Sequence, residues 1–242
     1  MRHPDHDAVA REVRRWYTTS FPEIGLLVEP RWYGYAGPRV VLTLDAPDRV
    51  AAALADARGR EVWVDDRRRA GVLHDAVIAT GYRTDRDTAF LALAGPLVAA
   101  PGPVGLAIEE AADDRLDAWA TVRIQGFDDT EDVPDPAAVA ALVATRRAEA
   151  AVARCLLATL DGEPVAALAY TTGRDQLVFN LATRVPFRHR GIGRALLAHW
   201  VARGDGCRSF VINADDGGSA AALYRRLGFA DEVHWRRCYV VS

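Results

Sequence analysis

The stretch LVFNLATRVPFRHRGIGRALL, residues 177–197, decides the fold. Its first seven residues form a mostly apolar run with the length and branching of a buried strand, and Val185-Pro186 closes that strand. A basic turn that contains glycine, residues 188–194, then leads into a helix pattern with apolar residues at 195–197 and 200. A strand, a glycine turn and a helix in this order predict a site that binds phosphate.

The turn at 188–194 carries the groups that attract an anion. The first amides of a helix have no partner within it, and they lie at the positive end of the peptide dipoles. Gly191 and Gly193 lack a Cβ, so a diphosphate can approach the backbone closely and the turn can adopt dihedral angles closed to other residues. Three arginines, Arg188, Arg190 and Arg194, add positive charge nearby.

The spacing Arg188-x-x-Gly191-x-Gly193 resembles the pyrophosphate loop of the GCN5-related N-acetyltransferases (GNATs), which follows the fourth strand of that domain and binds coenzyme A. The resemblance implies acetyl-CoA as the acyl donor. It also implies that a strand backbone pairs with the pantetheine arm while loop amides hold the pyrophosphate. The implied strand residues are Leu181, Ala182 and Thr183. The implied loop residues are Arg188, His189, Arg190, Gly191, Ile192, Gly193 and Arg194.

A second motif is ALYRRLGF, residues 222–229. It resembles the Leu-Tyr pair followed by Gly-Phe of the same family, in which the tyrosine hydroxyl lies near the coenzyme sulfur. The resemblance gives Tyr224 the role of general acid. The chemistry agrees, because a leaving thiol has a pKa of about 8.5 and a phenol one of about 10, so tyrosine stays protonated at neutral pH and can donate. Taken alone, Tyr224 also fits a half-buried helix aromatic.

The chain departs from the family pattern in two places. Many relatives carry an asparagine seven residues before the tyrosine, where this chain has Gly217, and Asn213 is the candidate substitute for that coenzyme contact. Many also carry a glutamate early on the fourth strand as general base, but residues 177–180 contain no carboxylate. The base is left open among several alternatives: Glu163, Asp175, His199, His234, a water held by backbone carbonyls and Asn180, or an amine that arrives neutral.

The composition of the chain narrows the class of protein and the partners that we expect. Half of the 242 residues are hydrophobic, enough for a sizeable core, and the formal net charge of −3 argues against nucleic acid as the main partner. No apolar stretch reaches the ~20 residues that cross a bilayer, and no signal peptide follows the first residues, so we expect a cytoplasmic protein that does not bind membranes. Cys155, Cys207 and Cys238 are expected to be reduced core thiols. His3 and His6 indicate a frayed terminus, so we expect no metal.

Elsewhere in the chain, strand and helix patterns alternate, with a hairpin signal at Asp161-Gly162-Glu163. This order predicts an α/β fold, a mixed twisted sheet with helices on both faces, in two lobes. The expected strands are 39–44, 60–64, 88–93, one beginning at 104, 153–160, 164–171, 177–183, 209–213 and 233–241. The expected helices are 7–18, 47–57, 72–79, 115–126, 136–150, one after Arg194, and 218–227. An aromatic cluster at 31–35 is either small-domain core or pocket wall.

The order of elements also repeats. Residues 60–64 resemble 208–212, and Gly81-Tyr82 corresponds to Gly228-Phe229 at an offset of 228 − 81 = 147. The first copy has no glycine-arginine turn between Leu44 and Pro47, and His74 stands near the place of the tyrosine. We therefore expect a degenerate GNAT-like domain at 1–95, a linker at 96–103 and a catalytic GNAT domain at 104–242.

These observations predict an acetyl-CoA-dependent N-acetyltransferase that acts on a primary amine by direct attack on the thioester. The acceptor is expected to be a small molecule, in a pocket shaped by the first lobe and residues 115–135. Two alternatives stay open, a non-catalytic module of the same fold that binds or senses coenzyme A, and a partner-binding protein with both lobes degenerate. The oligomeric state is left open between a monomer and a homodimer.

Overall fold

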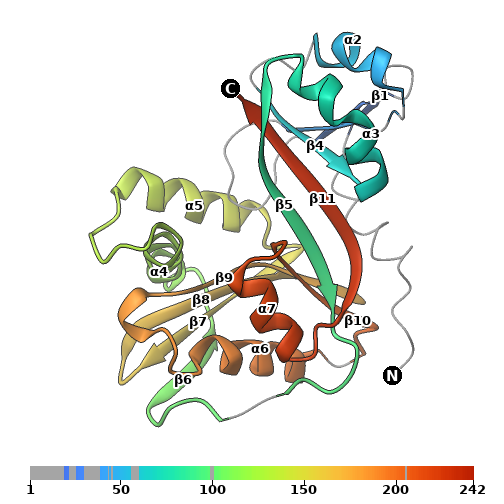
Figure 1. The fold of residues 1–242 in the computed structure, drawn as a ribbon. Coiled ribbons are helices and arrows are strands. Elements are labelled where there is room, and N and C mark those ends of the chain that lie inside the picture. The colour runs from blue at the N-terminus through green and yellow to red at the C-terminus, as the bar shows by residue number, and fades with distance from the viewer. Residues whose placement is uncertain are drawn as a thin grey trace. The chain divides into compact units, whose positions relative to one another are not determined.

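The computed structural model describes residues 19–21, 26–29, 39–42, 44, 46–55, 60–98, 101–204 and 206–242. The predicted helix at 7–18 and the aromatic cluster at 31–35 lie outside these residues. The described chain forms two compact units (Figure 1). Unit 1 contains residues 93–212 and 225–230, and unit 2 contains the described residues between 19 and 92 together with 213–224 and 231–242. The predicted domain boundaries 1–95, 96–103 and 104–242 stay a prediction.

Unit 1 is built on a mixed sheet with the strand order β10-β9-β8-β7-β6. The strands are β6 (Leu106–Glu110), β7 (Ala153–Leu160), β8 (Glu163–Thr171), β9 (Asp175–Thr183) and β10 (Ser209–Asp215). Neighbours from β6 to β9 are antiparallel, and β10 pairs with β9 in parallel. The predicted hairpin at Asp161-Gly162 joins β7 to β8, and both residues have the positive φ, 51° and 87°, of a tight hairpin turn.

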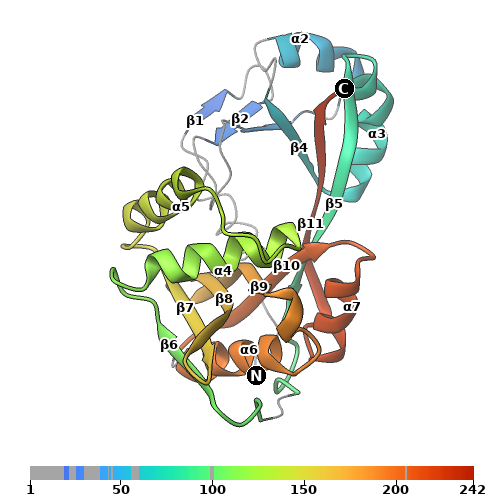
Figure 2. The same cartoon turned by 90° about the vertical axis from the view of Figure 1, so that its left-hand side faces the viewer.

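Helices cover both faces of this sheet, as Figure 2 shows. On one face α4 (Leu116–Asp128) packs on β7, β8 and β9, with α5 (Pro136–Ala148) beside it. On the other face lies α6 (Ile192–Arg203). Each face has a fully buried tryptophan: Trp119 of α4 donates to Leu168 O at 3.0 Å, and Trp200 of α6 donates to Gln176 Oε1 at 2.7 Å. The predicted fold class, a mixed sheet with helices on both faces, is confirmed.

The strands of unit 2 also include parallel and antiparallel pairs, and their order is β1-β2-β3-β4-β11-β5. Its strands are β1 (Thr19–Phe21), β2 (Leu26–Glu29), β3 (Arg39–Leu42), β4 (Glu61–Asp65), β5 (Tyr82–Ala92) and β11 (Asp231–Val241). Its helices are η1 (Pro47–Arg49), α2 (Val50–Ala55) and α3 (Arg67–Ile78), and most of α7 (Ser219–Arg226) also belongs to it. Leu73 and Val77 of α3 join Val62 and Val64 of β4 in a core that is shielded from solvent.

The strands of the two units repeat one pattern of pairing. In unit 2 the pairs β1–β2 and β2–β3 are antiparallel and β3–β4 is parallel. In unit 1 the pairs β7–β8 and β8–β9 are antiparallel and β9–β10 is parallel. A helix follows the third strand of each series, α2 after β3 and α6 after β9.

Two elements of unit 2 start earlier than the sequence predicts. Helix α3 begins at Arg67 rather than at 72, because the Asp66 side chain accepts hydrogen bonds from the amides of Arg68 and Arg69 and so caps a polar first turn. Strand β5 begins at Tyr82 rather than at 88, and its charged part pairs with β11, where Arg237 Nη2 lies 2.7 Å from Asp87 Oδ2. Both elements begin with charged residues, so apolar periodicity does not predict where they start.

Candidate functional site

The turn before α6 has the backbone geometry of an anion-binding concavity. After the short helix η2 (Val185–Phe187), His189 and Gly191 adopt left-handed φ values of 62° and 80°. Successive N–H groups in alternating right- and left-handed conformations converge on one point, which favours a bound anion. Gly191 is required at its position, since a φ near 80° is costly for a residue that has a Cβ.

The amides of this turn are open. Gly191 caps α6 without a side-chain hydrogen bond, and the first backbone bond of the helix runs from Ala195 N to Gly191 O at 3.0 Å. In the part of the chain that the structure describes, no amide from 189 to 194 donates to another protein group. By contrast, α5 starts at Asp135, whose carboxylate accepts from Ala137 N. The start of α6 is therefore a ready donor set for a diphosphate.

The three arginines of the turn have different environments. Arg188 Nε donates to Thr183 O at 3.0 Å, and its Nη2 donates to Gly126 O at 2.7 Å and also pairs with Asp129. Arg188 therefore ties the end of β9 to the end of α4, and its charge is already balanced. Arg190 is exposed, with its guanidinium carbon 5.3 Å from the Phe187 ring. Arg194 is half-buried, and its Nε has no hydrogen-bond partner among the described residues.

Strand β9 leaves a free edge beside the turn. Its ladder with β10 runs from Asp175–Ser209 to Val178–Ile212 and stops there, while its ladder with β8 continues to Thr183. A register shift between Ala169 and Tyr170 of β8 places one extra residue, Phe179, in β9. The segment 181–183, predicted to pair with the pantetheine arm, thus has backbone groups on one edge that β10 does not pair.

The end of β9 also lies against both the turn and α4. A Cβ built on Gly193 would lie 3.7 Å from Thr183 Oγ1, which is ordinary contact. A Cβ on Gly126 of α4 would lie 2.9 Å from Ala182 Cβ and 3.2 Å from Thr183 N, so only glycine permits this close approach. The structure thus brings Thr183, Arg188 and Gly193 together, as the sequence predicts, and adds Gly126, which sequence reasoning missed.

Asn180 is the polar side chain at the middle of β9. It is 2 % exposed, and its Oδ1 accepts a hydrogen bond of 3.1 Å from Arg123 Nε on α4. The sequence predicts Asn180 as a residue that holds a water, and it predicts no role for Arg123. Its signal is a lone arginine within the otherwise mostly apolar stretch 118–124 of α4.

The predicted general acid and the second coenzyme contact belong to unit 2. Tyr224 lies on α7, is 6 % exposed, and has its pKa raised by burial, so the hydroxyl stays protonated. Asn213 lies half-buried on β10. Gly217 and Gly228 on either side of α7 both have positive φ, 78° and 106°. The roles of Tyr224 and Asn213 toward the coenzyme stay predictions.

Several of the candidates for a general base have structural partners. Glu163 pairs with Arg184 at 2.7 Å, and Asp175 pairs with Arg208 and accepts from Ser209 Oγ at 2.6 Å. His234 Nε2 lies 3.3 Å from Asp65 Oδ1 in unit 2. His199 lies on α6, and its pKa is lowered by burial and by Arg203, so it is neutral at pH 7. None of these environments singles out a base.

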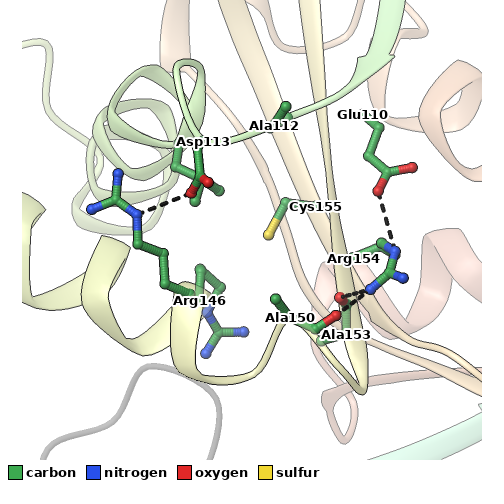
Figure 3. Close-up of a pocket in the computed structure, with 11 residues that line it drawn as sticks. Glu110, Ala112, Asp113, Arg146, Ala150, Ala153, Arg154 and Cys155 are labelled. Carbon is green, nitrogen blue, oxygen red and sulfur yellow. Dashed lines mark hydrogen bonds and ion pairs between the residues drawn. The ribbon is translucent and has the colours of Figure 1, made fainter.

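A cavity of about 550 Å³ lies in unit 1 beside α5 and the ends of β6 and β7 (Figure 3). Its charged rim is made of ion pairs, Arg154 Nε with Glu110 at 3.2 Å and Arg147 Nε with Asp113 at 3.0 Å. The Cys155 sulfur points into it. Burial raises the pKa of Cys155 to about 12, so a fraction on the order of 10⁻⁵ is thiolate at pH 7. The Cys155 thiol that lines the cavity is therefore protonated at neutral pH.

Neither a metal centre nor a membrane span is found in the described ranges. No three histidine, cysteine, aspartate or glutamate side chains gather there in a way that could hold a metal ion. Every helix in the described part of the chain is too short or too polar to cross a bilayer.

Comparisons with known proteins agree with this fold. Residues 151–231 match the family described as acetyltransferase (GNAT) domain. A GCN5-related N-acetyltransferase from Kribbella flavida is similar in structure, with 18% identity, a TM-score of 0.63, and coverage of 98% of this chain and 93% of that one. Another from Sphaerobacter thermophilus has 20% identity, a TM-score of 0.59 and coverage of 95% and 84%.

A tandem GNAT protein from the clavulanic acid biosynthesis pathway is also similar, with 13% identity, a TM-score of 0.57 and coverage of 88% of this chain and 77% of that one. At these identities the likeness concerns the fold. A comparison with curated proteins finds no match.

Proposed function

We propose that this protein transfers an acetyl group from acetyl-CoA to a primary amine of a small molecule, because residues 151–231 match the family described as acetyltransferase (GNAT) domain. The observation that carries the proposal is the set of open amides from 189 to 194, where the positive end of α6 meets the left-handed residues His189 and Gly191. A diphosphate fits that donor set, and the uncapped Gly191 leaves no side chain in its way.

The proposed coenzyme contacts follow from this placement. Amides of residues 189–194 hold the diphosphate, and Arg190 and Arg194 are neighbouring cations. Arg188 holds the turn in place through its hydrogen bonds to β9 and α4. The free edge of β9 at Leu181, Ala182 and Thr183 pairs with the amide groups of the pantetheine arm, as an added strand does. Asn213 is proposed as a further coenzyme contact.

The proposed reaction is a direct transfer. The thioester supplies the activated acetyl group. The amine nitrogen forms a bond with the acetyl carbon, the carbon–sulfur bond breaks, and Tyr224 gives its proton to the departing sulfur. The proton that the amine nitrogen loses passes to water and returns through it to the Tyr224 oxygen. Burial raises the pKa of Tyr224, so its hydroxyl carries a proton before the transfer. The neutral Cys155 supports a mechanism without an acyl-enzyme.

We also propose that residues 1–95 are a degenerate GNAT-like copy, with 96–103 as linker and 104–242 as the catalytic domain. The support is the repeated series of antiparallel, antiparallel and parallel pairs in β1–β4 and β7–β10. The acceptor is proposed to bind near α4 and α5, where both acidic and basic side chains line the cavity at Cys155.

Thiol release tests the proposal. The protein is mixed with acetyl-CoA and a panel of primary amines, and free thiol is followed with a chromogenic disulfide. We expect thiol release that depends on both protein and amine. Tight binding of coenzyme A by calorimetry without release for any amine would instead favour the non-catalytic coenzyme A-binding module. Absence of both binding and release would contradict the proposal in either form.

A further inference from the structure

Asn180 presents an unused hydrogen-bond donor inside unit 1. The residue is 2 % exposed, and its Nδ2 has no hydrogen-bond partner in the described residues. Buried amide groups are almost always paired, because an N–H group removed from water without an acceptor lowers stability. An unpaired buried donor in a functional domain therefore indicates that a ligand supplies the acceptor.

Arg123 fixes the direction of that donor. A guanidinium only donates hydrogen bonds, so the Asn180 atom 3.1 Å from Arg123 Nε must be the amide oxygen. The Nδ2 group is thereby turned away from Arg123. Arg123 is itself held in place, since its guanidinium carbon lies 4.6 Å from the centre of the Phe127 ring on the same helix.

The position along β9 indicates what the acceptor is. Asn180 follows the extra residue Phe179 and lies two residues beyond the last β9–β10 pair, Val178–Ile212. It directly precedes the free edge at 181–183. Its partner across β8 is Ala169, whose partner on β7 is Cys155, so its cross-strand neighbours on that face are small. The donor thus stands where the open edge of β9 begins, beside small side chains.

We propose that Asn180 Nδ2 donates a hydrogen bond to the carbonyl oxygen of the donor acetyl group and stabilises the negative charge that develops there as the amine attacks. Asn180 transfers no proton in this role. The inference rests on the proposed acetyl transfer and adds to it a side-chain donor at the reacting carbonyl. A fixed donor aimed at developing charge acts on the transition state more than on binding, so its removal lowers kcat more than it changes KM.

Asn180→Asp is the decisive variant. The carboxylate is almost isosteric and keeps an oxygen for Arg123, while the Nδ2 donor is lost. We expect kcat to fall about 10²–10³-fold, the range for removal of one such donor, with the Kd for free coenzyme A within twofold of wild type. Free coenzyme A lacks the acetyl carbonyl, so it reports on the rest of the site. The melting temperature is expected to stay unchanged or to rise, because the introduced carboxylate forms an ion pair with Arg123.

Gln176→Glu is the matched control, another amide-to-acid change on β9 but outside the proposed site. Gln176 Oε1 accepts from Trp200 Nε1 at 2.7 Å, a contact that a carboxylate oxygen keeps, so this change is expected to leave kcat unchanged. An Asn180→Asp protein with kcat equal to or above that of wild type would overturn the inference. Equal loss of affinity for free coenzyme A and of kcat would also overturn it, because it would indicate a structural role.

A binding comparison separates this inference from the proposed function. If wild-type protein releases no thiol with any amine, acetyl transfer fails, but the carbonyl contact still predicts a tighter Kd for acetyl-CoA than for coenzyme A. Asn180→Asp should then abolish that difference. Wild-type protein that binds both ligands equally, or an Asn180→Asp protein that keeps the preference, would contradict the carbonyl contact even where turnover is observed.

Discussion

The segments β9–α6 and β3–α2 have the same topology, but their helices begin with different residues. Each leads from a strand through a helix to a parallel neighbour, with Val178 opposite Ile212 in one and Leu42 opposite Val64 in the other. Helix α6 has 12 residues and starts from an uncapped glycine with open amides. The other connection starts at Pro47, which has no N–H, continues with Asp48, and forms a helix of six residues. The proposed anion site therefore depends on the turn before α6 and not on the topology.

The largest expected effect is a loss of kcat on substitution in α7, and α3, the helix at the matching position of the repeat, provides the control. We expect Tyr224→Phe to lower kcat about 10²–10⁴-fold with coenzyme A affinity nearly unchanged, the range for loss of a general acid. Because burial raises the pKa of Tyr224, wild-type kcat should not fall between pH 7 and 10 through loss of this proton. His74→Ala on α3, where Nδ1 lies 3.4 Å from Tyr239 Oη, should leave kcat unchanged. Full activity of Tyr224→Phe would contradict the role of Tyr224 as general acid.

The next effect concerns the glycine that opens α6. Gly191→Val places a side chain at the donor set and forces a costly φ, so we expect coenzyme A to bind about 100-fold more weakly, the equivalent of two lost charge-assisted hydrogen bonds. Gly206→Val is the control beyond the far end of the same helix, since Gly206 has a φ of 77° and nothing within 4 Å of its Cβ position. Calorimetry and melting curves of both variants separate ligand loss from strain. Equal affinities in both variants would contradict the site.

A smaller effect is expected at the arginines of the turn, where Arg188 is predicted to contribute to stability and Arg190 to coenzyme A binding. Arg188→Ala removes charged hydrogen bonds to two carbonyls and is expected to lower the free energy of unfolding by about 2 kcal/mol. Arg190→Ala removes an exposed cation and is expected to weaken coenzyme A binding about fivefold, or about 1 kcal/mol, with unchanged stability. Chemical denaturation and calorimetry measure the two quantities. The reverse assignment of effects would show that Arg188, and not Arg190, serves the ligand.

The smallest effect is expected at the cavity. Cys155→Ala should keep kcat within about twofold, and iodoacetamide should not inactivate the wild-type enzyme through this residue, since the thiolate fraction is negligible at neutral pH. Mass spectrometry after incubation with acetyl-CoA should find no acetyl group on Cys155. A stable acetyl-cysteine on the reaction path would replace direct attack by a two-step transfer.

The sequence predicts the local features of this protein well and its distant contacts poorly. The strand, turn and helix at 177–197 are encoded by neighbouring residues, so apolar runs and glycines are enough to predict them, as they are for the hairpin at Asp161-Gly162. The partner of Arg188 is 62 residues away at Gly126, and that of Asn180 is 57 residues away at Arg123. Such pairs follow from how α4 crosses β9, which no local pattern specifies.

A crystal structure of the protein with coenzyme A tests the central claim most directly. We expect diphosphate oxygens within about 3.2 Å of backbone nitrogens between His189 and Arg194, and no coenzyme at the start of α2. A diphosphate bound elsewhere in the chain, with these nitrogens unchanged, would contradict the account.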